Sequence, residues 1–232
     1  MKLINIVEIK AKLVLQTGLH IGAGDSEMHI GGIDNSVIKH PITQSPYIPG
    51  SSLKGKIRTL LEWRSGAVQN APLTVKDITK NPEEVKNILR LFGISGDTKN
   101  SEQEVAEIGV SRLAFWDCAL NSDWEKAIRD DNQLLTEAKS ENTIDRITSL
   151  TTGGGVRQTE RVPAGAEFDF KLMLRQFEGD KPELLELVLK GLKLLELDSL
   201  GGSGSRGYGK VKFIELTVDG ETRNLDDIKP FE

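Results

Sequence analysis

Cysteine is almost absent from this chain of 232 residues, which holds a single one, Cys118. One cysteine excludes an internal disulfide and a zinc site built from a cysteine cluster. Long hydrophobic runs are missing too, since no apolar stretch approaches the ~20 residues that a membrane-spanning helix needs. Residues 1–13 alternate apolar and charged side chains and lack the continuous apolar segment of a signal peptide. We therefore expect a cytoplasmic protein without a membrane partner.

An excess of positive charge is also lacking, because the formal net charge is −5. Taken alone, this value argues against a nucleic-acid-binding protein. The charge is unevenly spread, however. Residues 1–66 carry 8 Lys and Arg against 5 Asp and Glu, whereas the remainder carries 22 against 30. Since a ligand meets the local field of a groove and not the summed charge, a phosphate-binding face remains compatible with this composition.

The pattern of apolar residues predicts a single α+β domain over residues 1–232, with no internal repeat and no linker. Strands are expected at 3–16, 111–120, 167–176 and 210–218. Helices are expected from Ser51 or Ser52 to Arg64 and over 183–197, with a shorter one at 83–92. With loops set aside, the order is βαββαβ, that of the ferredoxin-like fold, which RRM-type RNA-binding proteins also use.

Three large insertions interrupt this order, at 18–50, 66–108 and 122–163. The first is an extended loop rich in Gly, His and Pro, and the last is expected to be irregular. The polar stretches 96–107 and 122–160 are expected to become ordered only on RNA or on a neighbouring chain.

The segment Pro49–Arg58 gathers two hydroxyls and three cations at the start of a predicted helix. Ser51, Lys54 and Arg58 share one edge of the helical wheel, Ser52 lies beside them and Lys56 projects from the flank. A helix N-terminus offers unpaired N–H groups and partial positive charge, which suits a polyanion. A capped surface helix with solvated lysines is the alternative.

A second segment, Gly201–Gly209, contains the pattern G-x-G-x-x-G from Gly202 to Gly207. A dinucleotide-binding fingerprint must follow a strand and open a helix. This loop instead follows a helix and opens a strand, so that function is excluded. A glycine-rich backbone that approaches a ligand closely remains, with Ser203 in the loop and Arg206 available for phosphate. A flexible turn is the alternative.

The 18–40 loop holds three histidines and three carboxylates, namely His20, Asp25, Glu27, His29, Asp34 and His40. Their spacing fits no zinc motif. A single acid can still assist RNA cleavage, because RNA carries its own nucleophile in the 2′-hydroxyl. Asp34 lies in the sequence Gly31-Gly32-Ile33-Asp34-Asn35, where glycines let another chain approach. A role in an Asx-turn is the alternative for Asp34.

A basic arm follows the Gly153–Gly155 tract. Arg157 and Arg161 lie in it, and it continues as Val162-Pro163-Ala164-Gly165. On physical grounds the arm is either a solvated hairpin or an interface.

Together these stretches resemble the RAMP superfamily of CRISPR proteins over nearly the whole chain. The residues that carry the resemblance are Pro49–Arg58, the stretch RQTERVPAGAEF at 157–168, Gly201–Gly209 and Gly31–Asn35. Within that superfamily the sequence is most similar to the repeated backbone subunit of type III-A (Csm) effector complexes.

This resemblance implies a ferredoxin-like palm that holds a guide (CRISPR) RNA and a thumb hairpin, within 122–163, that wedges into the guide–target duplex. Copies would assemble head-to-tail along the guide, beside other Csm subunits. Each copy would be an endoribonuclease that cuts target RNA with Mg²⁺ or another divalent cation. The resemblance assigns cleavage to Asp34 and implies guide contacts at His20, Ser51, Ser52, Lys54, Lys56, Arg58, Gly202, Ser203 and Arg206, with Arg157 beside the thumb. It identifies no second carboxylate, so the metal ligands stay unassigned.

Two alternatives within the superfamily remain open. A guide-RNA scaffold would use the same palm without cutting, and only Asp34 separates it from the nuclease. A ribonuclease that processes repeat RNA would favour a histidine general base, for which His20 is the candidate. An enzyme acting on a small phosphorylated molecule is disfavoured by the context of the glycine-rich loop.

Overall fold

A five-stranded antiparallel sheet forms the centre of the computed structural model, which describes residues 2–24, 35–79, 81–94, 106–152 and 156–232. The strand order is β3-β7-β1-β8-β9. The strands are β1 (Leu3–Leu15), β3 (Leu113–Phe115), β7 (Glu167–Phe177), β8 (Val211–Val218) and β9 (Glu221–Thr222). The central strand β1 is hydrogen-bonded to β7 on one side and to β8 on the other.

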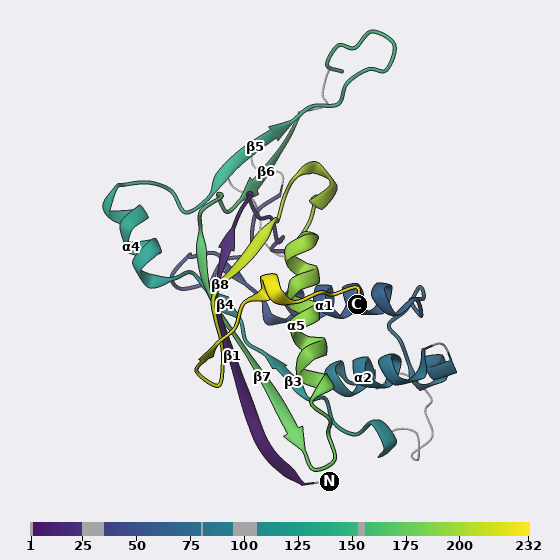
Figure 1. Cartoon of the computed structure of the whole chain (residues 1–232). Helices are drawn as coiled ribbons and strands as arrows, with labels where there is room; N and C mark the ends of the chain where they lie inside the picture. The colour runs from purple at the N-terminus through teal and green to yellow at the C-terminus, as the bar shows by residue number, and fades with distance from the viewer. Residues whose placement is uncertain (1, 25–34, 80, 95–105, 153–155) are drawn as a thin grey trace.

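Three helices lie on one side of this sheet (Figure 1). They are α1 (Gly50–Ser65), α2 (Pro82–Phe92) and α5 (Glu183–Leu197). Along the chain, α1 separates β1 from β3, and α5 separates β7 from β8. The predicted ferredoxin-like βαββαβ palm is therefore confirmed.

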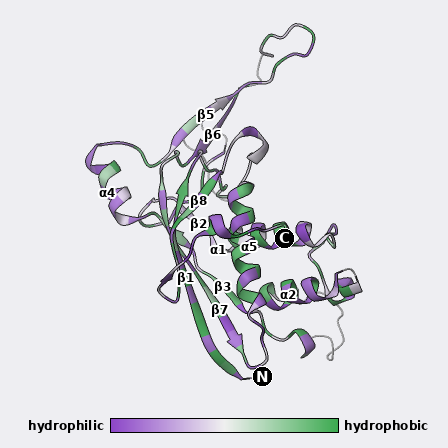
Figure 2. Ribbon diagram, viewed as in Figure 1, coloured by the Kyte–Doolittle hydropathy of each residue, from purple (hydrophilic) through white to green (hydrophobic). Residues whose placement is uncertain are grey.

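The core lies between the sheet and these helices. In β1 every second residue from Val7 to Leu15 is buried, as the period of a strand with one covered face requires. Helix α1 contributes a buried stripe, Leu53, Ile57, Leu60 and Leu61. Hydrophobic residues dominate α5 and β1 in Figure 2, and the two meet in one continuous core.

The prediction of one strand over 111–120 is wrong. The chain forms β3 and then, after a break at Trp116 and Asp117, the short strand β4 (Cys118–Ala119), which pairs with β2 (Tyr47–Ile48). At the break the Asp117 side chain accepts the N–H of Gly50 at 2.7 Å. Because Asp117 supplies this acceptor, α1 begins at Gly50 after Pro49, and neither Ser51 nor Ser52 is its cap.

The prediction that the insertion 122–163 is irregular is wrong. It contains α4 (Ser122–Asp130) and the strands β5 (Glu137–Glu141) and β6 (Arg157–Arg161), which pair in antiparallel register. We call β5, β6 and the residues between them the thumb hairpin. It projects away from the palm (Figure 1), so the hairpin that the family resemblance implies is present.

Short 3₁₀ helices complete the chain: η1 (Val75–Thr79), η2 (Gly204–Arg206) and η3 (Leu225–Asp227). The first lies within the predicted insertion 66–108. Most of the predicted polar stretch 96–107 lies outside the described residues. In the part of the chain that the structure describes, no helix is long and apolar enough to cross a membrane.

The glycine-rich loop packs against the end of β1 and does not hang free. The Gly209 N–H donates to the Gly18 carbonyl at 2.9 Å, and the Leu200 N–H donates to the Gly209 carbonyl at 2.8 Å. Gly209 has a φ of 70°, and a Cβ there would lie 1.9 Å from the Leu200 oxygen. Gly207 has a φ of 83°, but a Cβ there would meet nothing within 4 Å. Close backbone packing therefore fixes the loop at Gly209, whereas the space around Gly207 could accept a side chain.

We predict that Gly209→Ala destabilises the fold much more than Gly207→Ala. The substitution at Gly207 should lower the free energy of unfolding by only about 1–2 kcal/mol, the cost of a left-handed alanine. At Gly209, displacement of the Leu200 carbonyl adds about 1–3 kcal/mol of overpacking. Urea unfolding of the two variants measures the difference, and equal losses would contradict the close packing.

Candidate functional site

Asp34, the predicted catalytic residue, lies outside the described residues, as do Asp25, Glu27 and His29. The structure does describe how the chain enters and leaves this segment. The Ala23 N–H donates to the Ser36 carbonyl at 3.2 Å, and the Ile38 N–H donates to the Ile21 carbonyl at 2.9 Å. These two hydrogen bonds hold the two ends of the segment together.

Glu160 of β6 fixes the residues that directly follow Asp34. Its N–H donates to the Asn35 carbonyl at 2.9 Å. Its buried carboxylate accepts the Val37 N–H at 2.9 Å, the Lys39 ammonium at 2.5 Å and the Thr136 hydroxyl at 2.7 Å. One residue of the thumb hairpin therefore anchors the chain immediately after Asp34.

The electrostatic balance at Glu160 favours a carboxylate. Burial by itself raises the pKa of Glu160, but the hydrogen bonds from Lys39, Thr136 and Val37 outweigh burial. The pKa of Glu160 therefore lies below its ordinary value of 4.5. The group is ionised and paired at neutral pH.

His20 lies beside the same residue. Its Nδ1 is 2.7 Å from the Glu160 carbonyl oxygen. A carbonyl can only accept, so Nδ1 carries the proton and, in the neutral ring, Nε2 carries the lone pair. The His20 carbonyl in turn accepts the Gly202 N–H at 2.9 Å, and a Cβ on Gly201 would lie 2.3 Å from that oxygen. The structure thus brings His20, β6 and the glycine-rich loop into contact.

The thumb hairpin and the glycine-rich loop meet around Tyr208. This ring is 1 % exposed, and it lies 4.4 Å from the Lys139 ammonium and 5.1 Å from the Arg161 guanidinium. Arg206 is half-exposed, donates to the Ser203 hydroxyl and pairs with Glu141 at 3.1 Å. Cations from both elements therefore lie close to this ring, where Glu141 pairs with Arg206 and Lys139 and Glu137 pairs with Arg161.

On α1, Ser51 is exposed, whereas Ser52 and Lys54 are half-buried. The Lys56 ammonium pairs with Asp198 at 3.1 Å and lies 5.6 Å from the centre of the Trp63 ring. These four side chains remain candidates for contact with a polyanion.

Arg58 differs from these four side chains in its contacts, although the helical wheel predicted that it shares an edge of α1 with Ser51 and Lys54. Its guanidinium donates to Glu62 at 2.7 Å, to the Leu73 carbonyl at 2.9 Å and to the Gly93 carbonyl at 3.1 Å. Because residues 73 and 93 fold back over this edge of α1, Arg58 stabilises the fold. We leave it out of the proposed RNA surface.

The two arginines of the predicted basic arm differ. Arg157 is exposed and opens β6 opposite Glu141. Arg161 donates to Glu137 at 2.6 Å and lies along Gly18, where a Cβ would be 2.5 Å from its Cδ. Of the two, Arg157 is therefore the one whose side chain has no partner among the described residues and can face a ligand.

Sequence reasoning missed Glu160, Lys39 and Tyr208. Glu160 lies in a polar stretch, RQTER, that reads as an exposed strand, and its partners are more than 20 residues away. No local pattern marks a residue whose role depends on such distant contacts.

A metal centre is not apparent within the ranges that the structure covers. No three His, Cys, Asp or Glu side chains among the described residues are placed to hold a metal ion. The predicted divalent cation concerns Asp34 and stays a prediction.

We predict that Glu160→Gln lowers the free energy of unfolding at neutral pH by about 1–3 kcal/mol, since Lys39 loses its charged partner. A carboxyl whose folded-state pKa is lowered stabilises the protein above its unfolded pKa. That stabilisation disappears as the pH falls through the folded value. The difference between wild type and variant should therefore shrink from pH 7 to about pH 3. Denaturant unfolding across this range measures it, with exposed Glu178→Gln as the control. A pH-independent difference would contradict the ionised network.

Comparison with known proteins agrees with this geometry. The model of the RAMP superfamily matches residues 12–212. A protein of Streptococcus thermophilus named CRISPR system Cms endoribonuclease Csm3 is 42% identical over an alignment of 227 positions, gaps included, which spans 95% of this chain and 92% of that protein. The protein of the same name from Mycobacterium tuberculosis is 40% identical over an alignment of 234 positions, gaps included, which spans 95% of this chain and 91% of that protein.

A solved structure, the Csm3–Csm4 subcomplex in the type III-A CRISPR-Cas interference complex, contains a chain similar to this one. The TM-score is 0.56 at 28% identity, and the match covers 94% of this chain and 80% of that chain. The matches extend over the palm, the thumb hairpin and the glycine-rich loop together. This chain belongs to the RAMP superfamily, among its Csm3 proteins.

Proposed function

We propose that this chain is a guide-RNA-binding backbone subunit of a type III-A CRISPR interference complex that cleaves complementary target RNA endonucleolytically at regular intervals. The name endoribonuclease carried by its relatives supports this proposal. The observation that carries it is structural. Glu160 links His20, the start of the glycine-rich loop and the residue after Asp34 within one hydrogen-bonded unit.

The guide RNA would be held mainly through its phosphates. The N-terminal turn of α1 and the glycine-rich loop offer hydroxyls, backbone N–H groups and cations, which bind phosphate without reading bases. A backbone subunit needs contacts of this kind, because the guide sequence varies. The residues we assign to this surface are His20, Ser51, Ser52, Lys54, Lys56, Arg157, Gly202, Ser203 and Arg206.

Cleavage would use the 2′-hydroxyl of the target RNA as the nucleophile. The Asp34 carboxylate orients this hydroxyl or accepts its proton while the adjacent phosphodiester is attacked. The hydroxyl oxygen bonds to phosphorus, and the P–O bond to the 5′-oxygen breaks. The 5′-oxygen takes a proton from water, which yields a 2′,3′-cyclic phosphate and a 5′-hydroxyl. Asp34 can do this reproducibly only if its segment has a fixed base, which Glu160 supplies through Asn35 and Val37.

The proposal also includes a cofactor, the partners of the chain and its cellular location. Cleavage requires Mg²⁺ or another divalent cation. Copies of the chain assemble head-to-tail along one guide, an open heterologous arrangement, next to other Csm subunits. The complex acts in the cytoplasm.

Asp34→Ala should abolish target cleavage in the assembled complex while binding of the target stays within about twofold of wild type, since one carboxylate contributes little to the held duplex. Cleavage by the wild type should stop when EDTA replaces Mg²⁺. Gel analysis of end-labelled target RNA measures both, and evenly spaced cuts are expected.

Two results would oppose the assigned role of Asp34. A wild-type complex that binds complementary RNA and never cuts it would make the chain a scaffold. Loss of target binding in Asp34→Ala would make the residue part of the binding surface.

Lys54→Ala and Arg206→Ala should each weaken guide binding and make it less dependent on salt. For single-stranded RNA, removing one phosphate contact lowers the slope of log K against log salt concentration by about 0.7. Fluorescence anisotropy with labelled guide RNA at several salt concentrations measures the slope. Lys229→Ala, at an exposed site near the C-terminus, is the control. An unchanged slope in both variants would remove these residues from the guide surface.

A further inference from the structure

Two of the cations assigned to the guide are already paired with carboxylates of the described chain. Lys56 pairs with Asp198 at 3.1 Å, and both residues belong to the palm. Arg206 pairs with Glu141, also at 3.1 Å, and this carboxylate comes from β5 of the thumb hairpin. The Arg206 side chain is 54 % exposed, against 25 % for Lys56. Arg206 therefore has more freedom to turn from its carboxylate to another anion.

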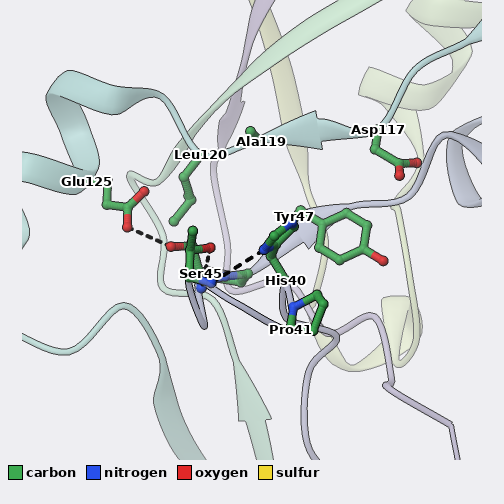
Figure 3. Close-up of a pocket in the computed structure, with 10 residues that line it drawn as sticks. His40, Pro41, Ser45, Tyr47, Asp117, Ala119, Leu120 and Glu125 are labelled. Atoms are coloured by element: carbon green, nitrogen blue, oxygen red, sulfur yellow. Dashed lines mark hydrogen bonds between the residues drawn. The ribbon is translucent and has the colours of Figure 1, made fainter.

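The carboxylates near the start of α1 have a different role. Asp117 accepts the first N–H of this helix at 2.7 Å and lines a cavity of about 410 Å³ (Figure 3). Glu125 lines the same cavity, accepts the Ser45 hydroxyl at 2.6 Å and pairs with Arg129 at 2.7 Å. Among the described residues, neither carboxylate pairs with a cation that we assign to the guide. Both hold segments of the palm and α4 in place.

Glu141 lies among cations where the thumb hairpin meets the palm. Besides Arg206, it pairs with Lys139 at 3.4 Å. It also lies opposite Arg157 in the ladder of β5 and β6, and directly opposite residues of an antiparallel pair share one face. A phosphate in place of this carboxylate would therefore bind Arg206 and approach Arg157, both of which we assign to the guide.

A buried donor without an acceptor lies beside this ion pair. The Tyr208 side chain is 1 % exposed, and its hydroxyl forms no hydrogen bond with any described residue. Burial and the nearby Glu141 carboxylate raise the pKa of Tyr208, so the hydroxyl keeps its proton at neutral pH and can donate. An unpaired buried hydroxyl is unfavourable, and a hydrogen bond to a carboxylate would remove that penalty.

We propose that Glu141 occupies the position of a guide phosphate on Arg206 and turns to the Tyr208 hydroxyl when the guide binds. The inference rests on the proposed function, because it concerns the same guide surface. In the exchange, Arg206 replaces one anion with another. Glu141 replaces the guanidinium with the unpaired hydroxyl and stays near Lys139, which lies 4.4 Å from the centre of the Tyr208 ring. Each lost contact is thus replaced by a new one.

The exchange favours a long anion over a small one. An isolated phosphate gains at Arg206 little more than Glu141 already supplies. A guide RNA also contacts α1 and the rest of the glycine-rich loop, and contacts made together on one strand can displace a competitor that each alone cannot. Glu141 therefore sets how readily the surface accepts RNA.

Removal of the Glu141 charge tests the displacement. Glu141→Gln should tighten binding of a labelled guide RNA by about 2–5-fold, since the guide no longer has to break a surface ion pair. The gain should vanish in an Arg206→Ala background, because it depends on that guanidinium. Fluorescence anisotropy with the full-length chain measures both. No tightening, or tightening that persists without Arg206, would overturn the proposal.

Glu137→Gln is the matched control. It removes the same charge from the same strand, but its partner Arg161 packs along Gly18 and is not assigned to the guide. This variant should change guide binding much less than Glu141→Gln. Equal tightening by the two variants would reveal a general effect of charge and would contradict a local exchange.

Tyr208→Phe tests the second step, since it removes the hydroxyl and keeps the ring. The free chain should unfold at the same temperature as the wild type or a higher one, because the hydroxyl has no partner there. Guide binding should weaken by about 3–10-fold, because the displaced carboxylate no longer finds a donor. Thermal unfolding and anisotropy measure the two effects. A less stable free chain, or unchanged guide binding, would refute the transfer of Glu141 to Tyr208.

These measurements separate the inference from the proposed function. If the wild type binds guide RNA and Glu141→Gln binds it no more tightly, the inference fails while the proposed function stands. If the wild type does not bind guide RNA, the proposed function fails and the inference fails with it.

Discussion

The rest of the site depends on one buried carboxylate, that of Glu160. Glu160 binds three parts of the chain. Its N–H and its side chain both bind the 35–39 segment, through Asn35, Val37 and Lys39, its side chain also binds Thr136, and its carbonyl binds His20. An unpaired carboxylate at this depth would be costly, so the surrounding donors must stay in place for the fold to tolerate it. The same contacts hold Asn35 and Val37, the residues that follow Asp34, in place.

The glycine-rich loop joins this unit for a steric reason more than a chemical one. Gly201 and Gly209 lie where a Cβ would overlap the carbonyl oxygens of His20 and Leu200. Only glycine allows the loop to approach that closely. Tyr208, within this loop, is buried, and its ring lies near cations of the thumb hairpin. Palm and thumb are therefore joined at the surface that is proposed to hold the guide.

The fold could be predicted from sequence because it follows from local periodicity: β1, α5 and the stripe of α1 appear where the apolar residues place them. The errors have a common cause. Each depends on a partner from a distant segment. Asp117, where the predicted strand divides, bonds to Gly50, where α1 begins. Arg58 bonds to the carbonyls of Leu73 and Gly93 and does not face solvent. For the candidate site, the motifs identified the participating segments, but the contacts made by Glu160 could not be read from a polar pentapeptide.

The central place of β1 in the sheet determines when the molecule can fold during synthesis. This strand is made well before its two neighbours, which come from the last third of the given sequence, with Leu13 opposite Phe168 on one side and Phe213 on the other. Until β8 has left the ribosome, one edge of β1 has no strand to pair with. Contacts this remote in sequence slow folding and prolong the exposure of apolar strands. A nascent chain that stops before β8 lacks one side of its own core, so only complete translation yields a subunit fit to assemble.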